Sequence, residues 1–180
     1  PQTDGESEMP LVTVVIPTHN RSKLLKRAIT SVLAQDCKDF ELIVVDDDST
    51  DDTLQTIMSF ASQKIRYIKH ASNYHASISR NTGIEHAKGE YLAFLDDDDE
   101  WSPGKLSAQL DLMSKASPEV GLIYCWLDYI NSKGEKVFEV HPTLRGDVFL
   151  DVLDMQRLGN SSTLLVKLSA ANEVGGFDKT

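Results

Sequence analysis

The sequence is poor in cysteine and has no long apolar run, and each absence excludes a class of protein. Cys37 and Cys125 are the only cysteines among 180 residues, and no C-x-x-C pair occurs, so a disulfide scaffold and a zinc ribbon are excluded. The longest uninterrupted apolar stretch, residues 122–127, is far shorter than the roughly 20 residues that a membrane-spanning helix needs. Residues 1–9 are polar and acidic, unlike a signal peptide, and we expect residues 1–10 to form a flexible leader.

The glycine-rich loops of the common phosphate-binding enzymes are also missing. No G-x-G-x-x-G follows the first expected strand and no G-x-x-x-x-G-K-[ST] occurs, so a dinucleotide-dependent dehydrogenase and a P-loop enzyme are poorly supported.

Basic residues are in the minority, since 18 Lys and Arg stand against 28 Asp and Glu and the net charge is −10. Ten of the acids lie in two short runs, within 46–52 and at 96–100, and the rest of the chain is neutral. This distribution argues against nucleic-acid binding, which needs a basic surface. It favours a site for cations, or for ligands that arrive with cations.

Apolar residues alternate between strand-like and helix-like patterns over about the first 115 residues. Strands are predicted at 11–16, 40–45, 65–69 and 90–95, and amphipathic helices at 22–35, 54–61, 79–88 and from Pro103 onward. Such alternation implies right-handed crossovers and a mostly parallel sheet with helices on both faces. The predicted fold class is α/β, with one domain over residues 11–180.

The last third of the chain is less regular. Residues 120–129 and 135–140 flank Asn131-Ser132-Lys133-Gly134 and predict a hairpin, which would make the sheet mixed. Residues 146–158 have a weak helical pattern, and residues 162–167 could form a further strand.

Polar side chains follow three of the expected strands at the point where each strand ends. The second and fourth strands lead into the two acidic runs. The first strand leads into a polar turn made of Pro17, Thr18, His19, Asn20 and Arg21. Because ligands of open α/β sheets bind beyond the carboxyl ends of the strands, these three segments are predicted to form one site.

The acidic run at 96–99 is the strongest candidate for a metal site. Neighbouring carboxylates raise one another's pKa unless a cation lies among them. Mg²⁺ or Mn²⁺ is the natural cation, because such ions are often held by one or two carboxylates together with substrate phosphates. In an extended segment Asp96 and Asp98 point to one side, and Asp97 and Asp99 to the other. The alternative is a solvated acidic loop that also caps the following helix.

The other acidic run and two arginines are candidates for binding a nucleotide. Asp46 and Asp47 lie at a strand end, where a fixed carboxylate can accept a hydrogen bond from a nucleobase N–H or a ribose hydroxyl. Without a phosphate loop, a diphosphate must be neutralised by metal and by scattered basic groups, for which Arg21 and Arg80 are the candidates. Either arginine could instead be an ordinary structural or surface cation.

Three ordered motifs resemble those of family 2 glycosyltransferases with the GT-A fold. They are Val14-Val15-Ile16-Pro17-Thr18-His19-Asn20-Arg21, Val44-Val45-Asp46-Asp47-Asp48-Ser49-Thr50-Asp51, and Ala87-Lys88-Gly89-Glu90-Tyr91 with Phe94-Leu95-Asp96-Asp97-Asp98-Asp99. Ser79-Arg80-Asn81-Thr82-Gly83-Ile84 and Val174-Gly175-Gly176-Phe177-Asp178 are also similar to family segments. The resemblance extends over residues 11–178 and implies a Rossmann-like GT-A domain.

The family resemblance also implies a reaction. A sugar would move from a nucleotide-sugar donor, most often a UDP-sugar, to a hydroxyl of a saccharide or lipid-linked acceptor, with inversion at the anomeric carbon and with Mn²⁺ or Mg²⁺ as cofactor. The product would be a polysaccharide or glycoconjugate. We expect a cytoplasmic protein, with peripheral contact to the inner face of the membrane left open, and an uncovered sheet edge could pair two copies into a homodimer.

Residue roles follow from the matched motifs. Thr18 and His19 would line the base pocket and Asp47 would bind the uracil N–H. The D-x-D motif would lie at 96–98, with Asp96 or Asp97 near the ribose and with Asp98 and Asp96 as metal ligands. The residues expected to bind the donor nucleotide are Pro17, Thr18, His19, Asn20, Arg21, Asp46, Asp47, Arg80, Asp96 and Asp97.

Two features depart from the family pattern. His75 stands where the family often has Gly in an Asn-x-Gly segment. The catalytic base of the family usually lies in a Glu-Asp pair beyond Gly-Gly-Phe-Asp, so we expect a domain truncated before its base, with the base beyond Thr180. Two alternatives stay open, a nucleotide-sugar-binding module without a complete catalytic apparatus and a sugar nucleotidyltransferase. The absence of a Gly-rich, Arg- or Lys-bearing loop after the first strand counts against the second.

Overall fold

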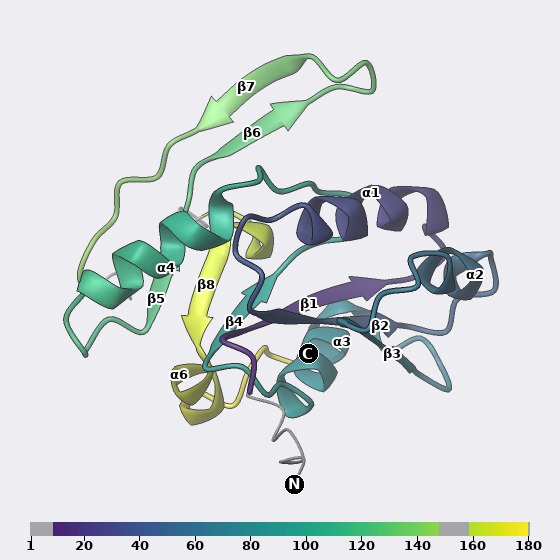
Figure 1. Ribbon diagram of the computed structural model, residues 1–180, viewed down its shortest axis with the longest axis horizontal. Coiled ribbons are helices and arrows are strands. Elements are labelled where there is room, and N and C mark those ends of the chain that lie inside the picture. The colour runs from purple at the N-terminus through teal and green to yellow at the C-terminus, as the bar shows by residue number, and fades with distance from the viewer. Residues whose placement is uncertain (1–8, 148–158, 180) are drawn as a thin grey trace, which may run out of the picture.

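The computed structural model describes residues 9–147 and 159–179, and a six-stranded sheet forms its centre (Figure 1). The strand order is β3-β2-β1-β4-β8-β5, with β1, β2, β3 and β4 parallel and with β8 antiparallel to both of its neighbours. The strands are β1 Val12–Thr18, β2 Phe40–Asp46, β3 Ile65–Lys69, β4 Tyr91–Phe94, β5 Leu122–Tyr124 and β8 Leu164–Lys167.

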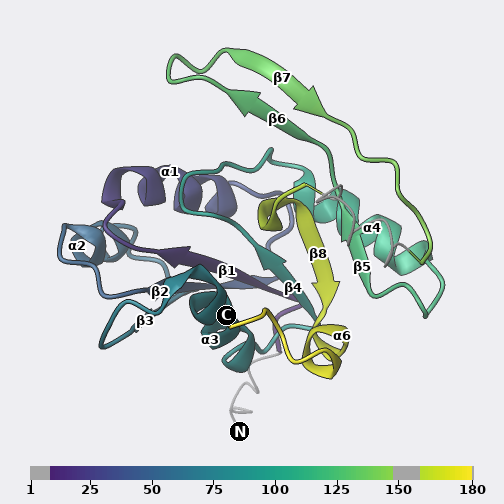
Figure 2. The ribbon, with the colours of Figure 1, turned by 180° about the vertical axis from the view of Figure 1, so that it is seen from behind.

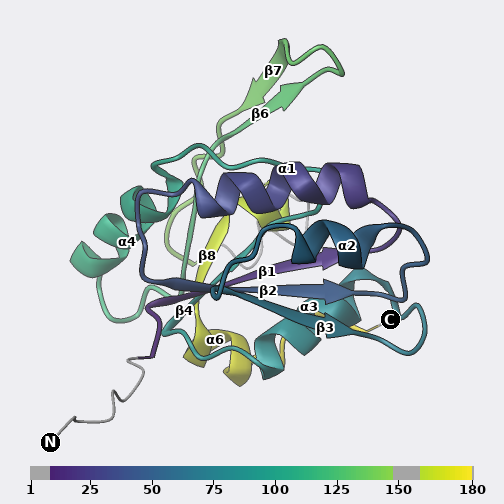
Figure 3. The same ribbon diagram turned by 45° about the vertical axis from the view of Figure 1, so that its right-hand side comes forward.

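Helices cover both faces of this sheet (Figure 3). One face packs against α1 (Ser22–Leu33), α2 (Thr53–Met58) and α4 (Lys105–Lys115). The opposite face packs against α3 (His75–Glu85) and α6 (Leu168–Glu173). The predicted α/β class, with a mostly parallel sheet covered on both sides, is therefore confirmed.

The two central strands are buried on both faces because their sequences are almost continuously apolar. Alternate side chains of β1 pack on opposite faces of the sheet. Val14 packs in the hydrophobic cluster that includes α1, and Val15 packs in the one that includes α3. The α3 backbone lies directly on β1, since a Cβ added to Gly83 would stand 2.3 Å from Val15 Cγ1. This close packing places the last turns of α3 against the middle of β1.

Two predicted boundaries next to the site were wrong. β1 runs through Pro17 to Thr18, because β4 pairs with β1 only as far as Val15 and the proline interrupts no ladder on that side. α3 begins at His75 instead of residue 79, so the helix includes the four residues that precede the predicted start.

The hairpin predicted from residues 120–129 and 135–140 forms only in part, because residues 122–124 belong to β5 of the central sheet. The remaining hairpin does not join that sheet. β6 (Leu127–Ile130) and β7 (Lys136–Val140) form a separate two-stranded sheet that projects from the body of the molecule (Figures 1 and 3). The sheet is mixed because of β8, which inserts antiparallel between β4 and β5 after a 3₁₀ turn at Ser161–Thr163.

Several expectations concern the ends and edges of the described structure. The predicted leader at 1–10 and the predicted helix at 146–158 fall mostly outside the described residues. The edge strands of the central sheet are β3 and β5, and pairing of two copies through an edge stays a prediction. Across residues 9–147 and 159–179, every helix is too short or too polar to cross a bilayer.

Candidate active site

A cavity of about 460 Å³ opens at the carboxyl ends of β1, β2 and β4. Its lining residues are Pro17, Thr18, His19, Arg21, Asp47, Asn73, His75, Ala76, Ser79, Arg80, Asp96, Asp97 and Asp98. The three segments predicted to converge therefore do converge at one sheet edge. Of the residues predicted to bind donor or metal, only Asn20 and Asp46 do not line this cavity.

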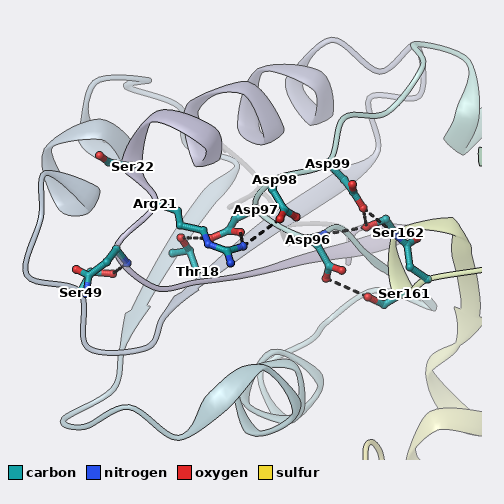
Figure 4. Close-up of polar contacts among 12 residues, drawn as sticks. Thr18, Arg21, Ser22, Ser49, Asp96, Asp97, Asp98, Asp99, Ser161 and Ser162 are labelled. Atoms are coloured by element: carbon teal, nitrogen blue, oxygen red, sulfur yellow. Dashed lines mark hydrogen bonds and ion pairs between the residues drawn. The ribbon is translucent and has the colours of Figure 1, made fainter. Parts of the chain in front are cut away.

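Asp97 lies at the centre of the polar network (Figure 4). The Thr18 hydroxyl donates to its Oδ2 at 2.7 Å, and Arg21 Nη1 donates to its Oδ1 at 3.1 Å. Burial raises the pKa of Asp97 although both hydrogen bonds favour the carboxylate. The same Arg21 nitrogen lies 3.1 Å from Asp98 Oδ2, so one guanidinium bridges two carboxylates of the D-x-D segment.

Asp96 is held from the opposite side of the cavity. Its Oδ1 accepts hydrogen bonds from Arg80 Nη2 and from the Ser161 hydroxyl, the latter at 3.0 Å (Figure 4). Arg80 lies over the Phe177 ring, 5.4 Å from its centroid, and is mostly buried. Its Nε is buried and has no hydrogen-bond partner in the part of the chain that is described. Arg80 is thus a fixed cation at the cavity wall.

The segment before β8 holds the acidic loop in place (Figure 4). The Ser162 hydroxyl donates to Asp99 Oδ2 at 2.6 Å and accepts from the Asp96 backbone N–H at 3.0 Å. Asn160 Nδ2 donates to the same Asp99 oxygen at 2.8 Å. Burial raises the pKa of Asp99, and the two hydrogen bonds oppose this effect. Asp99 therefore anchors the loop from which Asp96 and Asp98 face the cavity.

Asp47 borders the cavity, but its carboxylate oxygens already accept hydrogen bonds from other residues of the chain. It accepts hydrogen bonds from His70 Nδ1 at 2.7 Å, from the Tyr74 N–H at 2.9 Å and from the His75 N–H at 2.7 Å. Burial opposes its ionisation, yet these three donors together hold the pKa of Asp47 below its ordinary value. Asp47 thus fixes the loop between β3 and α3, and a contact with a uracil N–H stays a prediction.

The backbone of this loop keeps a glycine-like conformation without a glycine. His75 has φ +70°, in the left-handed region that glycine adopts most readily. The conformation directs the His75 N–H at Asp47 and leaves the residue at the cavity wall. His75 therefore adopts the backbone conformation that a glycine would adopt at this position.

His19 and Asn20 connect the turn after β1 to the turn after β2. His19 Nδ1 donates to the Asp47 carbonyl at 2.7 Å, and its Nε2 accepts from Asn20 Nδ2 at 3.0 Å. Asn20 Oδ1 in turn accepts from the Thr50 N–H at 2.8 Å. His19 lines the cavity, whereas the structure places Asn20 outside it as a link between two loops.

The structure places Asp46 away from the cavity as well. Its side chain is buried, its Oδ1 accepts from the Ser49 N–H at 2.7 Å, and its Oδ2 accepts from the Tyr67 hydroxyl at 2.6 Å. Both oxygens are used within the protein, and burial together with this bond raises the pKa of Tyr67. We therefore assign Asp46 a structural role and withdraw it from the donor-binding residues.

Asp96 and Asp98 are the residues that could hold a divalent cation. Within residues 9–147 and 159–179, no group of three or more His, Cys, Asp or Glu side chains could hold a metal ion by itself. The two carboxylates are hard oxygen ligands on the cavity wall, and the Asp98 side chain is 49% exposed. This donor set fits Mg²⁺ or Mn²⁺ in a site that substrate phosphates complete.

Several lining residues were missed by the sequence reasoning. Asn73, His75, Ala76 and Ser79 follow β3 and begin α3. Because β3 is parallel to β2, the same rule of strand ends could have found them. No sequence pattern predicts the hydrogen bond from Ser161 to Asp96, because Ser161 precedes a strand whose antiparallel placement the sequence does not reveal.

Comparison with known proteins agrees with this geometry. The profile described as "Glycosyl transferase family 2" matches residues 13–158. The chain is 34% identical over 122 residues to the UDP-Glc:alpha-D-GlcNAc-diphosphoundecaprenol beta-1,3-glucosyltransferase WfgD of Escherichia coli, with 68% of this chain and 47% of that protein covered. The chain spans about half the length of two uncharacterized glycosyltransferases of Rickettsia prowazekii and Rickettsia typhi, to which it is 32% and 33% identical.

Two solved structures show the same fold. TarS 1–349 of S. aureus in complex with UDP-GlcNAc has a TM-score of 0.73 at 20% identity, covering 91% of this chain and 47% of that one. The mannosyltransferase PcManGT of Pyrobaculum calidifontis, in complex with GDP-Man and Mn²⁺, has a TM-score of 0.71 at 22% identity, covering 96% and 49%. The fold is GT-A, and the chain belongs to glycosyltransferase family 2.

Proposed function

We propose that this protein transfers a sugar, with inversion, from a UDP-sugar to a hydroxyl of a lipid-linked saccharide, with Mn²⁺ or Mg²⁺ as cofactor. The observation that carries the proposal is the cavity at the sheet edge, where the three aspartates of the D-x-D segment pair with Arg21 and Arg80. This site has the charges that a nucleoside diphosphate and a divalent cation require.

The charge pairs in the cavity favour exchange with a metal–diphosphate complex. Arg21 now pairs with Asp97 and Asp98, and Arg80 pairs with Asp96. A bound divalent cation would take over the exposed carboxylates, and the phosphates would take over the arginines. Asp96, Asp98 and the two arginines would each keep a partner of opposite sign, and the buried Asp97 would keep its hydrogen bond from the Thr18 hydroxyl.

The lining residues suggest how the donor would lie. Thr18, His19 and Asn73 would hold the base and ribose, and the D-x-D segment with the two arginines would hold the diphosphate. The metal, when bound, would neutralise the charge that develops on the leaving diphosphate. Arg21 and Arg80 would orient the same group. The catalytic base stays a prediction beyond Thr180.

The acceptor class is supported by relatives. WfgD is named as acting on a diphosphoundecaprenol-linked GlcNAc with UDP-Glc as donor. By likeness to it we propose a lipid-linked acceptor saccharide for this protein, in the synthesis of a cell-surface glycan. A lipid-linked acceptor would bring the protein to the inner face of a membrane from the cytoplasm.

The proposal is tested by measuring UDP release from UDP-glucose, with and without a diphospholipid-linked GlcNAc acceptor, in Mn²⁺ and in EDTA. We expect metal-dependent release that is lost in Asp98→Asn and kept in Asp52→Asn, a matched change in the other acidic run. UDP binding without any release would favour the binding-module alternative. Release of pyrophosphate from UTP and a sugar phosphate would instead favour a nucleotidyltransferase. Equal release in EDTA and in Asp98→Asn would contradict the metal site.

A further inference from the structure

A second, larger cavity adjoins the first one. Its volume is about 910 Å³, and it is lined by the β6–β7 hairpin, by α4 and by the acidic loop. Asp98 lines both cavities, so the second one begins where the donor phosphates would end. The irregular segment that follows β7 passes beside α4 in both views (Figures 1 and 2).

Almost every charged side chain in the lining of this second cavity has a compensating partner. Lys136 of the hairpin pairs with Asp128 at 3.3 Å and with Glu139 at 2.7 Å. Glu100 pairs with Arg27. The two remaining aspartates are those of the acidic loop, one held by Arg21 and the other by Ser162 and Asn160.

Lys105 is the exception. It lies in the first turn of α4 and is 9% exposed, and no carboxylate of the described residues lies within 4.0 Å of its ammonium group. The Nζ atom donates to Gln109 Oε1 at 2.7 Å and lies 4.0 Å from the centroid of the Trp101 ring. An amide oxygen and an aromatic face compensate a buried cation only in part.

The neighbours of Lys105 are themselves fixed. Gln109 Nε2 donates to the Thr163 carbonyl at 2.9 Å, and Trp101 Nε1 donates to the Ser162 carbonyl at 2.9 Å. The ammonium group has three N–H donors, of which Gln109 uses one. Lys105 is therefore a preorganised cation with free donors in the wall of a cavity beside the donor site.

We propose that Lys105 binds an anionic oxygen of the acceptor, namely of the diphosphate that links the acceptor sugar to its lipid. This inference rests on the proposed function and assigns the acceptor half of the same site. The diphosphate of the donor already has Arg21 and Arg80 in the first cavity. Among the described residues that line the second cavity, Lys105 is the cation without a carboxylate partner, and it is therefore available to a second phosphate group. Lys105 acts as a specificity-determining residue.

The aromatic part of the lining suits the rest of such an acceptor. Trp101, Tyr124 and Trp126 line the second cavity, and Trp126 stacks on His141 with their ring centroids 4.0 Å apart. Aromatic faces of this kind can pack against a pyranose ring or the first carbons of a lipid. The sugar would lie between Asp98 and Lys105, with its phosphate end directed to the lysine.

The test compares two soluble probes that differ only in the diphosphate. One is α-GlcNAc joined through a diphosphate to a short alkyl chain, and the other is the alkyl α-glycoside of GlcNAc. Both are titrated calorimetrically into protein saturated with UDP and Mn²⁺, which prevents the diphosphate probe from entering the donor cavity. We expect the wild-type protein to bind the diphosphate probe about 10 to 100 times more tightly, as for one charged hydrogen-bonded contact.

The variants assign this preference to one residue. In Lys105→Met the preference should disappear while affinity for UDP stays unchanged. Lys136→Met is the matched control, because Lys136 lines the same cavity but is exposed and paired, and it should keep the preference. A wild-type protein that binds both probes equally, or a folded Lys105→Met that still prefers the diphosphate, would overturn the inference.

The two proposals fail in different ways. If UDP binds normally but the wild-type protein does not distinguish the probes, the assignment of Lys105 is wrong and the donor site stands. If UDP does not bind, the proposed function fails. The same probes, titrated without UDP into wild type and Lys105→Met, then show whether the lysine binds a diphosphate at all, and equal binding by the two proteins overturns this inference too.

Discussion

Replacing Lys105 by methionine should make the protein more stable at neutral pH, because the positive charge of the lysine is almost fully buried. Burial lowers the pKa of Lys105 from its ordinary value of 10.5 to about 8. That difference corresponds to about 3 kcal/mol by which the folded state disfavours the charged lysine. Methionine keeps the apolar stem of the side chain and removes the charge.

The net gain should be smaller than this penalty. The substitution also removes the hydrogen bond to Gln109 and the contact with the Trp101 ring, each worth about 1 kcal/mol. We therefore expect the free energy of unfolding to rise by about 1 kcal/mol at pH 7. The sign follows from proton binding: between pH 8 and 10.5 the unfolded chain holds the proton more tightly, so the penalty is full below this window and vanishes above it.

Urea denaturation of the two proteins at pH 7 and again near pH 10 measures this effect, because the difference between them cancels the titrating groups that do not interact with Lys105. The advantage of Lys105→Met should shrink or reverse at the higher pH. A variant that is less stable than the parent at pH 7, or a difference that does not depend on pH, would refute the reasoning. It would show that the contacts of Lys105 with Gln109 and Trp101 outweigh the free-energy penalty of burying its charge.

Three other substitutions test the site and its support. Asp46→Ala should lower stability by about 2–4 kcal/mol in chemical denaturation, because it leaves the Tyr67 hydroxyl and a backbone amide without an acceptor; a tenfold loss of UDP affinity in folded protein would instead return Asp46 to the site. Gly83→Ala should cost about 1–3 kcal/mol, because its methyl group would overlap Val15, and an unchanged Tm would contradict this packing. The hydrogen bonds that hold the pKa of Asp47 low stabilise the folded state above the pKa that Asp47 has in the unfolded chain, and this stabilisation is lost as the pH falls. Asp47→Asn should therefore be less stable than the parent at pH 7 and should lose less stability on acidification. An acid denaturation profile identical to that of the parent would contradict this prediction.

The parallel part of the fold and the donor half of the site could be predicted from the sequence, because their signals are local. Buried strands such as β1 are continuous apolar runs, and parallel strands place the residues that follow them at one edge. Thr18, Arg21 and Asp97 therefore meet as expected, although they come from distant segments. Asp46 was misassigned because the sequence does not show which of two neighbouring aspartates faces inward.

The proposed acceptor half of the site could not be predicted, because it depends on pairings that leave no periodic signal. β8 enters the sheet antiparallel, and this places Ser162 against Asp99 from 63 residues away. No signal in the sequence marks Lys105 as buried. Its burial follows only from the packing of α4 against the segment before β8, which the helical period of α4 does not reveal.

The central claim, a metal-dependent site for a nucleoside diphosphate, is tested most directly by calorimetric titration of UDP into this chain. The titration is made with Mn²⁺, with EDTA, and with Mn²⁺ in Asp98→Asn. We predict binding in Mn²⁺ that weakens at least tenfold in EDTA and in the variant, because Asp98 and the diphosphate would share the metal. Binding of equal strength in all three titrations, or no binding of UDP in Mn²⁺, would contradict the account.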